Sequence, residues 1–385
     1  MDRNVFSGEK ALQTYLNPDN HPPLPLVELP SALNPYREKG IRVFLKLMHF
    51  LPLGNVKSLP AYSMLEEAER SGTLRGVEAL VESSSGNTVL SLAVLGRAFG
   101  VSKTLALASH QVEHGKLQLL RFLGTEVRII EENICPDPSD PKSGINQAKQ
   151  MARDARWFNA GQYDNSANPA AHERWTGPQI WLQTEGKITL LAAGLGTTGT
   201  LCGTRAYLKA KNSKIRALGV VREPNNPVPG VRTKTLLNQV SFDWQSAADD
   251  LVSVGTKEAY EASLALCRAG LLVGPSSGFA VRGLMTHLSC LDSVELDGIR
   301  NEDGEVIAVV VAPDSPLPYI EEYFRYLGAD AFPRIENEHL LTHAASSMPE
   351  PGEVPADDVD LRAEELLETG YGMSMEELSL LCAKG

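Results

Sequence analysis

Short apolar runs alternate with amphipathic segments along most of the chain. The predicted strands are residues 76–82, 103–108, 126–130, 187–193, 215–221 and 306–312. The predicted helices are residues 87–98, 115–123, 200–211 and 257–269. Strands that alternate with helices indicate parallel sheets covered on both faces. The pattern therefore predicts an α/β fold made of two such units with a cleft between them.

Two segments depart from this alternation. Residues 135–144 are rich in Pro and Asp and predict a loop. After Ser346 the chain becomes acidic and Pro-rich, which is typical of a flexible linker, and the stretches 361–367 and 374–383 have helical spacing. Residues 341–385 hold ten Asp and Glu against two basic residues. This tail has two interpretations, a solvated appendage or a segment that docks on a partner or sister subunit.

Composition excludes several classes of protein. The 385 residues are 43% hydrophobic, and no apolar run approaches the length of about 20 residues that crosses a membrane. The start of the chain lacks the features of a secretory signal, so a cytoplasmic location is expected. Five cysteines with no CxxC pair predict neither a disulfide framework nor a cysteine zinc site. The net charge of −12 lies mostly in the tail, and no basic face predicts nucleic-acid binding.

A glycine-rich turn at 194–199 matches the pattern GxGxxG between a predicted strand and a predicted helix. Backbone N–H groups at the start of a helix attract anions, and the neighbouring threonine hydroxyls suit a terminal phosphate. Two alternatives stay open. Glu223 lies at the distance at which a dinucleotide site binds ribose, and a plain structural glycine turn has the same pattern.

Lys57 stands among apolar residues at the start of a helical segment. Burial lowers the pKa of a lysine, as an amine that attacks an aldehyde requires, although a surface lysine whose stem covers apolar atoms would look the same. Residues 82–88, ESSSGNT, place hydroxyls, an amide and a glycine turn between a strand and a helix, which favours carboxylate binding. The lysine, this cluster and the phosphate loop together indicate a cofactor that is a phosphorylated aldehyde.

Two other motifs predict different chemistry. Residues 274–278, GPSSG, fit the nucleophile turn of α/β-hydrolases, with Asp303 or Asp314 and His339 or His343 downstream, but no oxyanion segment precedes them. His110 and His114 have the HxxEH spacing of some zinc peptidases, which requires one continuous helix. The predicted strand ends near Ser109, so His110 falls in a turn and we expect no metal site.

Over roughly residues 20–340 these motifs resemble fold type II pyridoxal-phosphate enzymes of the cysteine synthase and cystathionine β-synthase family. The matching segments are 55–57 (NVK), 84–88 (SSGNT), 162–169 (QYDNSANP), 196–200 (GTTGT), 274–278 (GPSSG) and 313–315 (PDS). The resemblance implies a two-lobed fold similar to the tryptophan synthase β chain. It assigns residues 1–45 and 166–340 to a large cofactor-binding lobe, 46–165 to a small mobile lobe and 341–385 to the tail. It also implies a homodimer.

The resemblance implies a role for each matched residue. Lys57 would form the Schiff base with pyridoxal 5'-phosphate and act as the catalytic base. The other cofactor-binding residues would be Asn87 at the ring hydroxyl, Gly196, Thr197, Thr198, Gly199 and Thr200 around the phosphate, and Ser315 at the ring nitrogen. The residues expected to bind the amino-acid substrate are Ser84, Ser85, Gly86, Thr88, Gln162 and Gly274.

A hydroxyl at the ring nitrogen suits β-elimination and β-replacement better than transamination. The resemblance therefore implies replacement at Cβ through an α-aminoacrylate, with O-acetylserine, O-phosphoserine, serine or cysteine as donor and sulfide or another small nucleophile as acceptor. Two alternatives stay open, a β-eliminating deaminase or desulfhydrase and a non-catalytic cofactor-binding partner protein. Three departures from the family pattern can alter the pocket or its nucleophile, namely Ser58 for Asp, Val89 for Gly and Thr198 for Gly.

Overall fold

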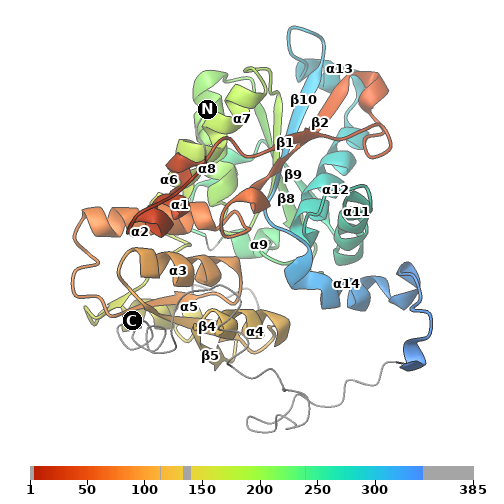
Figure 1. The fold of residues 1–385 in the computed structure, drawn as a ribbon. Coiled ribbons are helices and arrows are strands. Elements are labelled where there is room, and N and C mark those ends of the chain that lie inside the picture. Colours follow the sequence, from red (N-terminus) through yellow and green to blue (C-terminus); the bar gives the residue numbers. More distant parts are fainter. Residues whose placement is uncertain (1–3, 113, 133–139, 239, 341–385) are drawn as a thin grey trace. The chain divides into compact units, whose positions relative to one another are not determined.

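The computed structural model describes residues 4–112, 114–132, 140–238 and 240–340. The chain divides into two compact units, Met1–Ala329 and Asp330–Gly385, and all the elements discussed below belong to the first (Figure 1). The expected tail helices and residues 135–139 of the expected loop lie outside the described residues. No helix in the described part of the chain is long and apolar enough to span a membrane.

The first unit contains a six-stranded sheet with the order β1-β2-β10-β7-β8-β9. Its strands are parallel except β1, which pairs with β2 antiparallel. Their bounds are Leu26–Glu28 (β1), Ile41–Leu47 (β2), Leu190–Gly194 (β7), Arg216–Arg222 (β8), Asp250–Val254 (β9) and Val306–Ala312 (β10). Strand β10 lies in the interior of the sheet and all seven of its residues are buried, as an unbroken apolar run predicts.

Helices cover both faces of this sheet. Neighbouring residues of one strand point to opposite faces, so Leu190 joins the core on one side while Leu191 joins the core on the other. The first core is completed by α11 (Thr256–Arg268) and α12 (Pro275–Cys290). The second is completed by α6 (Ala167–Ala171), α7 (Gly177–Gln183) and α8 (Gly199–Lys211).

A four-stranded parallel sheet follows the order β5-β4-β3-β6. Its strands are Ala79–Ser83 (β3), Lys103–Ser109 (β4), Glu126–Ile130 (β5) and Trp157–Phe158 (β6). Leu80 packs against α2 (Ser58–Arg70) and α3 (Asn87–Ala98), while Val81 faces α5 (Gly144–Met151) on the opposite side. Helix α4 (His114–Phe122) leads from β4 to β5. The remaining α-helices are α1 (Ala11–Leu16), α9 (Lys234–Leu237), α10 (Trp244–Ala247), α13 (Ser293–Gly298) and α14 (Ile320–Leu327).

The α/β fold predicted from the sequence is confirmed, and the predicted strands and helices are present with shifts of up to three residues at their ends. Strand β3 begins at Ala79 rather than at 76, because Gly76 adopts a left-handed turn with φ of 77°. The apolar residues 271–273 before the GPSSG motif form no strand. Strands β1, β2, β6 and β9 were not expected. Lys46, which is fully buried on β2, interrupts the apolar pattern there.

The carboxyl ends of the parallel strands carry segments that the sequence analysis singled out. Residues 82–88, the serine-rich loop, run from the end of β3 into the start of α3, the glycine-rich turn follows β7, and residues 313–315 follow β10. Ligands of parallel α/β sheets bind at this edge, where loops and helix N-termini converge.

Candidate active site

Lys57 is the N-terminal cap of α2. Its backbone N–H donates to the Asn55 side chain at 2.9 Å, and the neighbouring Val56 N–H donates to the Pro313 carbonyl at 2.8 Å. The second bond connects the lysine segment to the residue that follows β10. Burial lowers the pKa of the Lys57 amine, and the nearby Asp314 carboxylate partly opposes this shift. A half-buried lysine with a lowered pKa is a candidate nucleophile.

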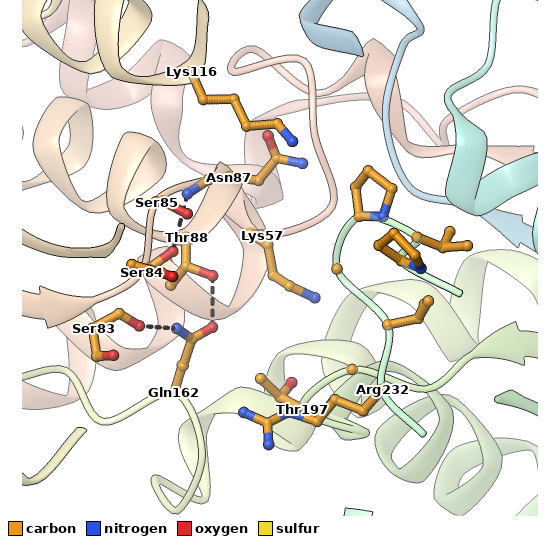
Figure 2. A pocket seen from close by; sticks show the side chains of 18 of the residues that line it. Lys57, Ser83, Ser84, Ser85, Asn87, Thr88, Lys116, Gln162, Thr197 and Arg232 are labelled. Carbon is orange, nitrogen blue, oxygen red and sulfur yellow. Dashed lines mark hydrogen bonds between the residues drawn. The ribbon is translucent and has the colours of Figure 1, made fainter. Parts of the chain in front are cut away.

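The serine-rich loop and Gln162 form one hydrogen-bonded unit (Figure 2). The Thr88 hydroxyl donates to the Gln162 side-chain oxygen at 2.7 Å. The Gln162 amide nitrogen donates to the Ser83 carbonyl at 3.2 Å, which fixes the orientation of the carboxamide. Lys57 points into the space between this unit and the segment that carries Thr197. Hydroxyls and the start of α3 therefore converge where a carboxylate could bind.

Glu82 is a buried acid that supports the serine-rich loop through Gln162. Its buried carboxyl accepts hydrogen bonds from the Gly161 N–H and the Gln162 amide. Burial raises the pKa of Glu82 to about 8, and those hydrogen bonds only partly offset the effect. Glu82 does not line either cavity described below, so its role is structural support of Gln162.

The start of α8 has the geometry of an anion site. The helix runs 13 residues from Gly199, and its cap residue Thr198 has a left-handed backbone with φ of 67°. Gly196 passes so close to the 229–231 segment that an added Cβ would lie 2.1 Å from the Gly230 carbonyl oxygen. The turn thus needs glycine at 196, which explains part of the motif.

Buried side chains brace the anion site. The Asn168 amide donates to the Thr197 hydroxyl at 3.0 Å and to the Gln162 carbonyl at 2.7 Å, and so connects the two halves of the site. His172 lies 3.2 Å from the Thr200 hydroxyl through Nε2. Burial lowers the pKa of His172 to about 3, and the charge of Lys57 adds to this shift. His172 is therefore neutral and acts as a hydrogen-bonding partner of Thr200.

Two adjoining cavities of about 190 and 60 Å³ lie between these segments. Lys57, Asn87, Gly196 and Thr197 line both. Of the other residues predicted from the sequence, the larger cavity is lined by Ser84, Ser85, Gly86, Thr88 and Gln162, and the smaller by Thr198 and Thr200. Gly199, Gly274 and Ser315 line neither cavity.

The cavities are also lined by residues that the sequence analysis did not assign to the site. These residues are Lys116, Glu132, Tyr163, Arg222, Arg232, Asp314, Tyr319 and Glu322. They come from separate elements, so no local motif unites them. Two of them gave a signal, because Tyr163 follows Gln162 in the 162–169 segment and Asp314 precedes Ser315 in the 313–315 segment.

Neither of the other motifs forms a complete site within the described part of the first unit. Ser276 lies buried in the first turn of α12, and of its expected histidine partners His339 belongs to the second unit and His343 lies outside the described residues. His110 occupies a turn and His114 begins α4, so one helix does not carry both. Within the described residues no group of three or more His, Cys, Asp or Glu side chains could hold a metal ion.

The fold and the cavity lining fit an enzyme whose cofactor is a phosphorylated aldehyde. The fit rests on three features, the depressed pKa of Lys57, the close-packed glycine turn at the start of α8, and a buried Asp314 oxygen that has no hydrogen-bond partner among the described residues. Lys57, Gly196 and Asp314 all line the smaller cavity.

The chain belongs to the pyridoxal-phosphate dependent enzymes, whose family model matches residues 19–298. It is 30% identical over 307 residues to a cysteine synthase of Aquifex aeolicus, covering 77% of this chain and 88% of that protein. It is 31% identical to the cystathionine beta-synthase of Saccharomyces cerevisiae, covering 79% of this chain and 61% of the yeast protein.

Solved structures support the same fold. The cysteine synthase of Entamoeba histolytica superposes with a TM-score of 0.68 at 22% identity, over 84% of this chain and 93% of that chain. The cofactor is pyridoxal 5'-phosphate, as predicted, and the dinucleotide alternative for the glycine-rich turn is wrong.

Proposed function

We propose that this chain catalyses β-replacement, in which a small nucleophile displaces a leaving group from Cβ of an amino acid. The donors we propose are O-acetylserine, O-phosphoserine, serine or cysteine, and the nucleophile is sulfide or another small thiol or amine. The observation that carries the proposal is the position of Lys57, between a hydroxyl-rich carboxylate loop and an anion-binding helix start. The cysteine synthase and cystathionine beta-synthase relatives support the same reaction class.

Pyridoxal phosphate, when bound, supplies an aldehyde that links to an amine and an electron-withdrawing ring. The chain's own residues do the rest. The N–H groups at the start of α8, with Thr197, Thr198 and Thr200, would hold the phosphate. Asn87 would hold the ring hydroxyl. We propose that Ser315 approaches the ring nitrogen, although it lines neither cavity.

Substrate binding and proton transfer fall to the other half of the site. Ser84, Ser85, Gly86 and Thr88, with Gln162 behind them, would bind and orient the substrate carboxylate. Lys57 would remove the α-proton and hold it at Nζ, because burial favours the neutral amine, while the nearby Asp314 carboxylate favours the protonated form that results. We further propose that residues 46–165 move as the small lobe and exclude water when substrate binds.

Borohydride trapping tests the cofactor linkage. The protein is loaded with pyridoxal phosphate, reduced and digested, and the peptides are analysed by mass spectrometry. The added mass should be on Lys57 and should vanish in Lys57→Gln. Lys116→Gln is the matched control, because this lysine lines the same cavity and its loss should leave the label in place. A label on another residue, or none, would overturn the proposal.

Product analysis then tests the reaction. O-acetylserine, O-phosphoserine and serine are each supplied with and without sulfide, and cysteine, pyruvate and ammonia are measured. Replacement predicts cysteine that depends on sulfide. Pyruvate and ammonia at equal rates with or without sulfide would identify an eliminating lyase instead, and a labelled protein that consumes no donor would identify a non-catalytic partner protein. We also propose a homodimer, which sedimentation of the full chain would test.

A further inference from the structure

Asp314 is a buried carboxyl in the wall of the smaller cavity, with 3% of its surface exposed. Its backbone is held firmly, because its carbonyl accepts a hydrogen bond from the Gly274 N–H at 2.9 Å. Asp314 also forms a β-bridge with Asn55, two residues before Lys57. The side chain therefore has a fixed position relative to the reactive amine.

One oxygen of Asp314 accepts two hydrogen bonds. The Asn87 amide nitrogen donates to Oδ2 at 2.7 Å, and the Tyr319 hydroxyl donates to the same atom at 2.6 Å. The other oxygen, Oδ1, is buried and has no hydrogen-bond partner among the described residues. Asn87 begins α3 on the four-stranded sheet, whereas Asp314 follows β10 of the six-stranded sheet, so this bond joins the two.

The bond determines how the Asn87 carboxamide is turned. A carboxylate accepts hydrogen bonds and cannot donate them, so the amide nitrogen and not the amide oxygen must face Asp314. An amide nitrogen carries two N–H groups and can bond two acceptors at once. Asn87 lines both cavities, and a nitrogen held in this orientation can also serve an acceptor inside them.

We infer that Asp314 is a positioning residue, which holds the Asn87 amide nitrogen toward the oxygen of the cofactor ring hydroxyl. This inference rests on the proposed role of Asn87 in the same site. The inference gives this carboxyl a function at the site, and burying a carboxyl is otherwise costly.

Charged neighbours from several elements act on Asp314. Burial raises the pKa of its carboxyl, while Tyr319 and Asn87, through hydrogen bonds, and Lys116 and Lys57, through charge, lower the pKa toward its ordinary value. The Oδ2 atom accepts the Asn87 bond whether or not Oδ1 carries a proton, so the positioning role does not depend on full ionisation.

A double-mutant cycle tests the inference. The variants are Asp314→Ala, Asn87→Ala and both together, with Asp314→Asn as the conservative variant and the exposed Asp303→Ala as the matched control. The readouts are the dissociation constant of pyridoxal phosphate for the apoprotein and the visible spectrum of the bound cofactor. Circular dichroism establishes that each variant is folded.

If Asp314 acts through Asn87, each alanine variant should weaken cofactor binding about tenfold, and the double variant should bind no more weakly than the worse single variant. Asp314→Asn should bind within about threefold of the wild type, because its amide oxygen still accepts from Asn87. Asp303→Ala should bind as the wild type does.

Additive losses in the double variant would overturn the inference. So would an Asp314→Asn variant that binds as poorly as Asp314→Ala and has a shifted spectrum, because that result would assign the charge of Asp314 to the cofactor directly. Labelling of Lys57 separates this failure from a failure of the proposed function. If the wild-type protein is labelled at Lys57 and the losses of the two alanine variants are additive, only the role of Asp314 is disproved.

Discussion

Lys116 and Glu322 form an ion pair at 2.5 Å between α4, beside the four-stranded sheet, and α14, which follows the six-stranded sheet. Both side chains are largely buried, at 13% and 7% exposed, and both line the larger cavity. The Tyr260 hydroxyl donates to the other oxygen of Glu322, and the Lys116 ammonium lies 4.9 Å from the centre of the Tyr319 ring. The pair therefore connects α4 with α14 in the lining of the larger cavity.

Removing one member of this pair should be costly. Lys116→Met leaves the Glu322 carboxylate buried without its cation, and we expect the free energy of unfolding to fall by about 3 kcal/mol. Urea denaturation measures this change. The double variant Lys116→Met with Glu322→Leu should recover much of the loss, because no charge then stays buried.

Lys257 is a matched control for the pair. It forms an ion pair with Glu261 on the surface, where the two side chains are 71% and 55% exposed. Lys257→Met should change the free energy of unfolding by no more than about 0.5 kcal/mol. Equal effects of Lys116→Met and Lys257→Met would show that the cavity pair contributes no more than a surface pair.

Thr198 occupies a conformation that suits glycine. A left-handed backbone costs an L-residue about 1–2 kcal/mol, while glycine loses about 0.5–1 kcal/mol of conformational entropy on folding. Thr198→Gly should therefore raise the free energy of unfolding of the apoprotein by about 0.5–1 kcal/mol, measured by urea denaturation. Thr204 lies fully buried within α8, and Thr204→Gly should lower it by at least about 1 kcal/mol. A Thr198→Gly variant as unstable as Thr204→Gly would show that the backbone at 198 is unstrained.

Glu82 should make stability depend on pH. Its pKa is about 8 in the folded protein against an ordinary value of 4.5, so the folded state binds more protons than the unfolded state between these values. The stability that Glu82 contributes is present below pH 4.5 and is lost as pH rises toward 8. Each unit of pH in this range changes the free energy of unfolding by at most about 1.4 kcal/mol.

Glu82→Gln removes the titrating group. From pH 5 to pH 8 its free energy of unfolding should rise relative to the wild type, by roughly 2 kcal/mol once solvent relaxation is allowed for. Denaturation at several pH values measures the difference. Glu78→Gln, at an exposed position just before β3, is the control and should follow the wild-type profile. A constant difference between Glu82→Gln and the wild type would mean that Glu82 titrates normally.

The strands and helices around the site could be predicted because their patterns are local. The strand 306–312 and the helix 87–98 have the predicted bounds, since each carries an unbroken apolar run or a regular amphipathic spacing. Lys57 and the 82–88 loop could be predicted as well, because an isolated lysine and a hydroxyl cluster stand out against apolar neighbours.

The rest of the site depends on contacts between distant residues. Asp314 meets Asn87 across 227 positions of sequence, and Lys116 meets Glu322 across 206. Neither lysine nor glutamate is unusual in an amphipathic helix, so the sequence gives no reason to select Lys116 or Glu322. Strand β2 was missed because Lys46 looks exposed, whereas its ammonium is buried and donates to the Leu24 carbonyl and two glutamine side chains.

Gly196 provides a test of the anion site that does not involve a charged or hydroxyl group. A Cβ at this position would lie 2.1 Å from the Gly230 carbonyl oxygen, which is backbone and cannot rotate away. Gly196→Ala should therefore push apart the turn after β7 and the 229–231 segment, lowering the free energy of unfolding by about 1–3 kcal/mol. Cofactor binding should weaken at least tenfold, because the N–H groups of the turn would no longer converge. Gly298→Ala is the control, since a Cβ there meets no atom within 4 Å and both quantities should stay unchanged. If Gly196→Ala bound pyridoxal phosphate as tightly as Gly298→Ala, the phosphate would have to bind somewhere other than the start of α8.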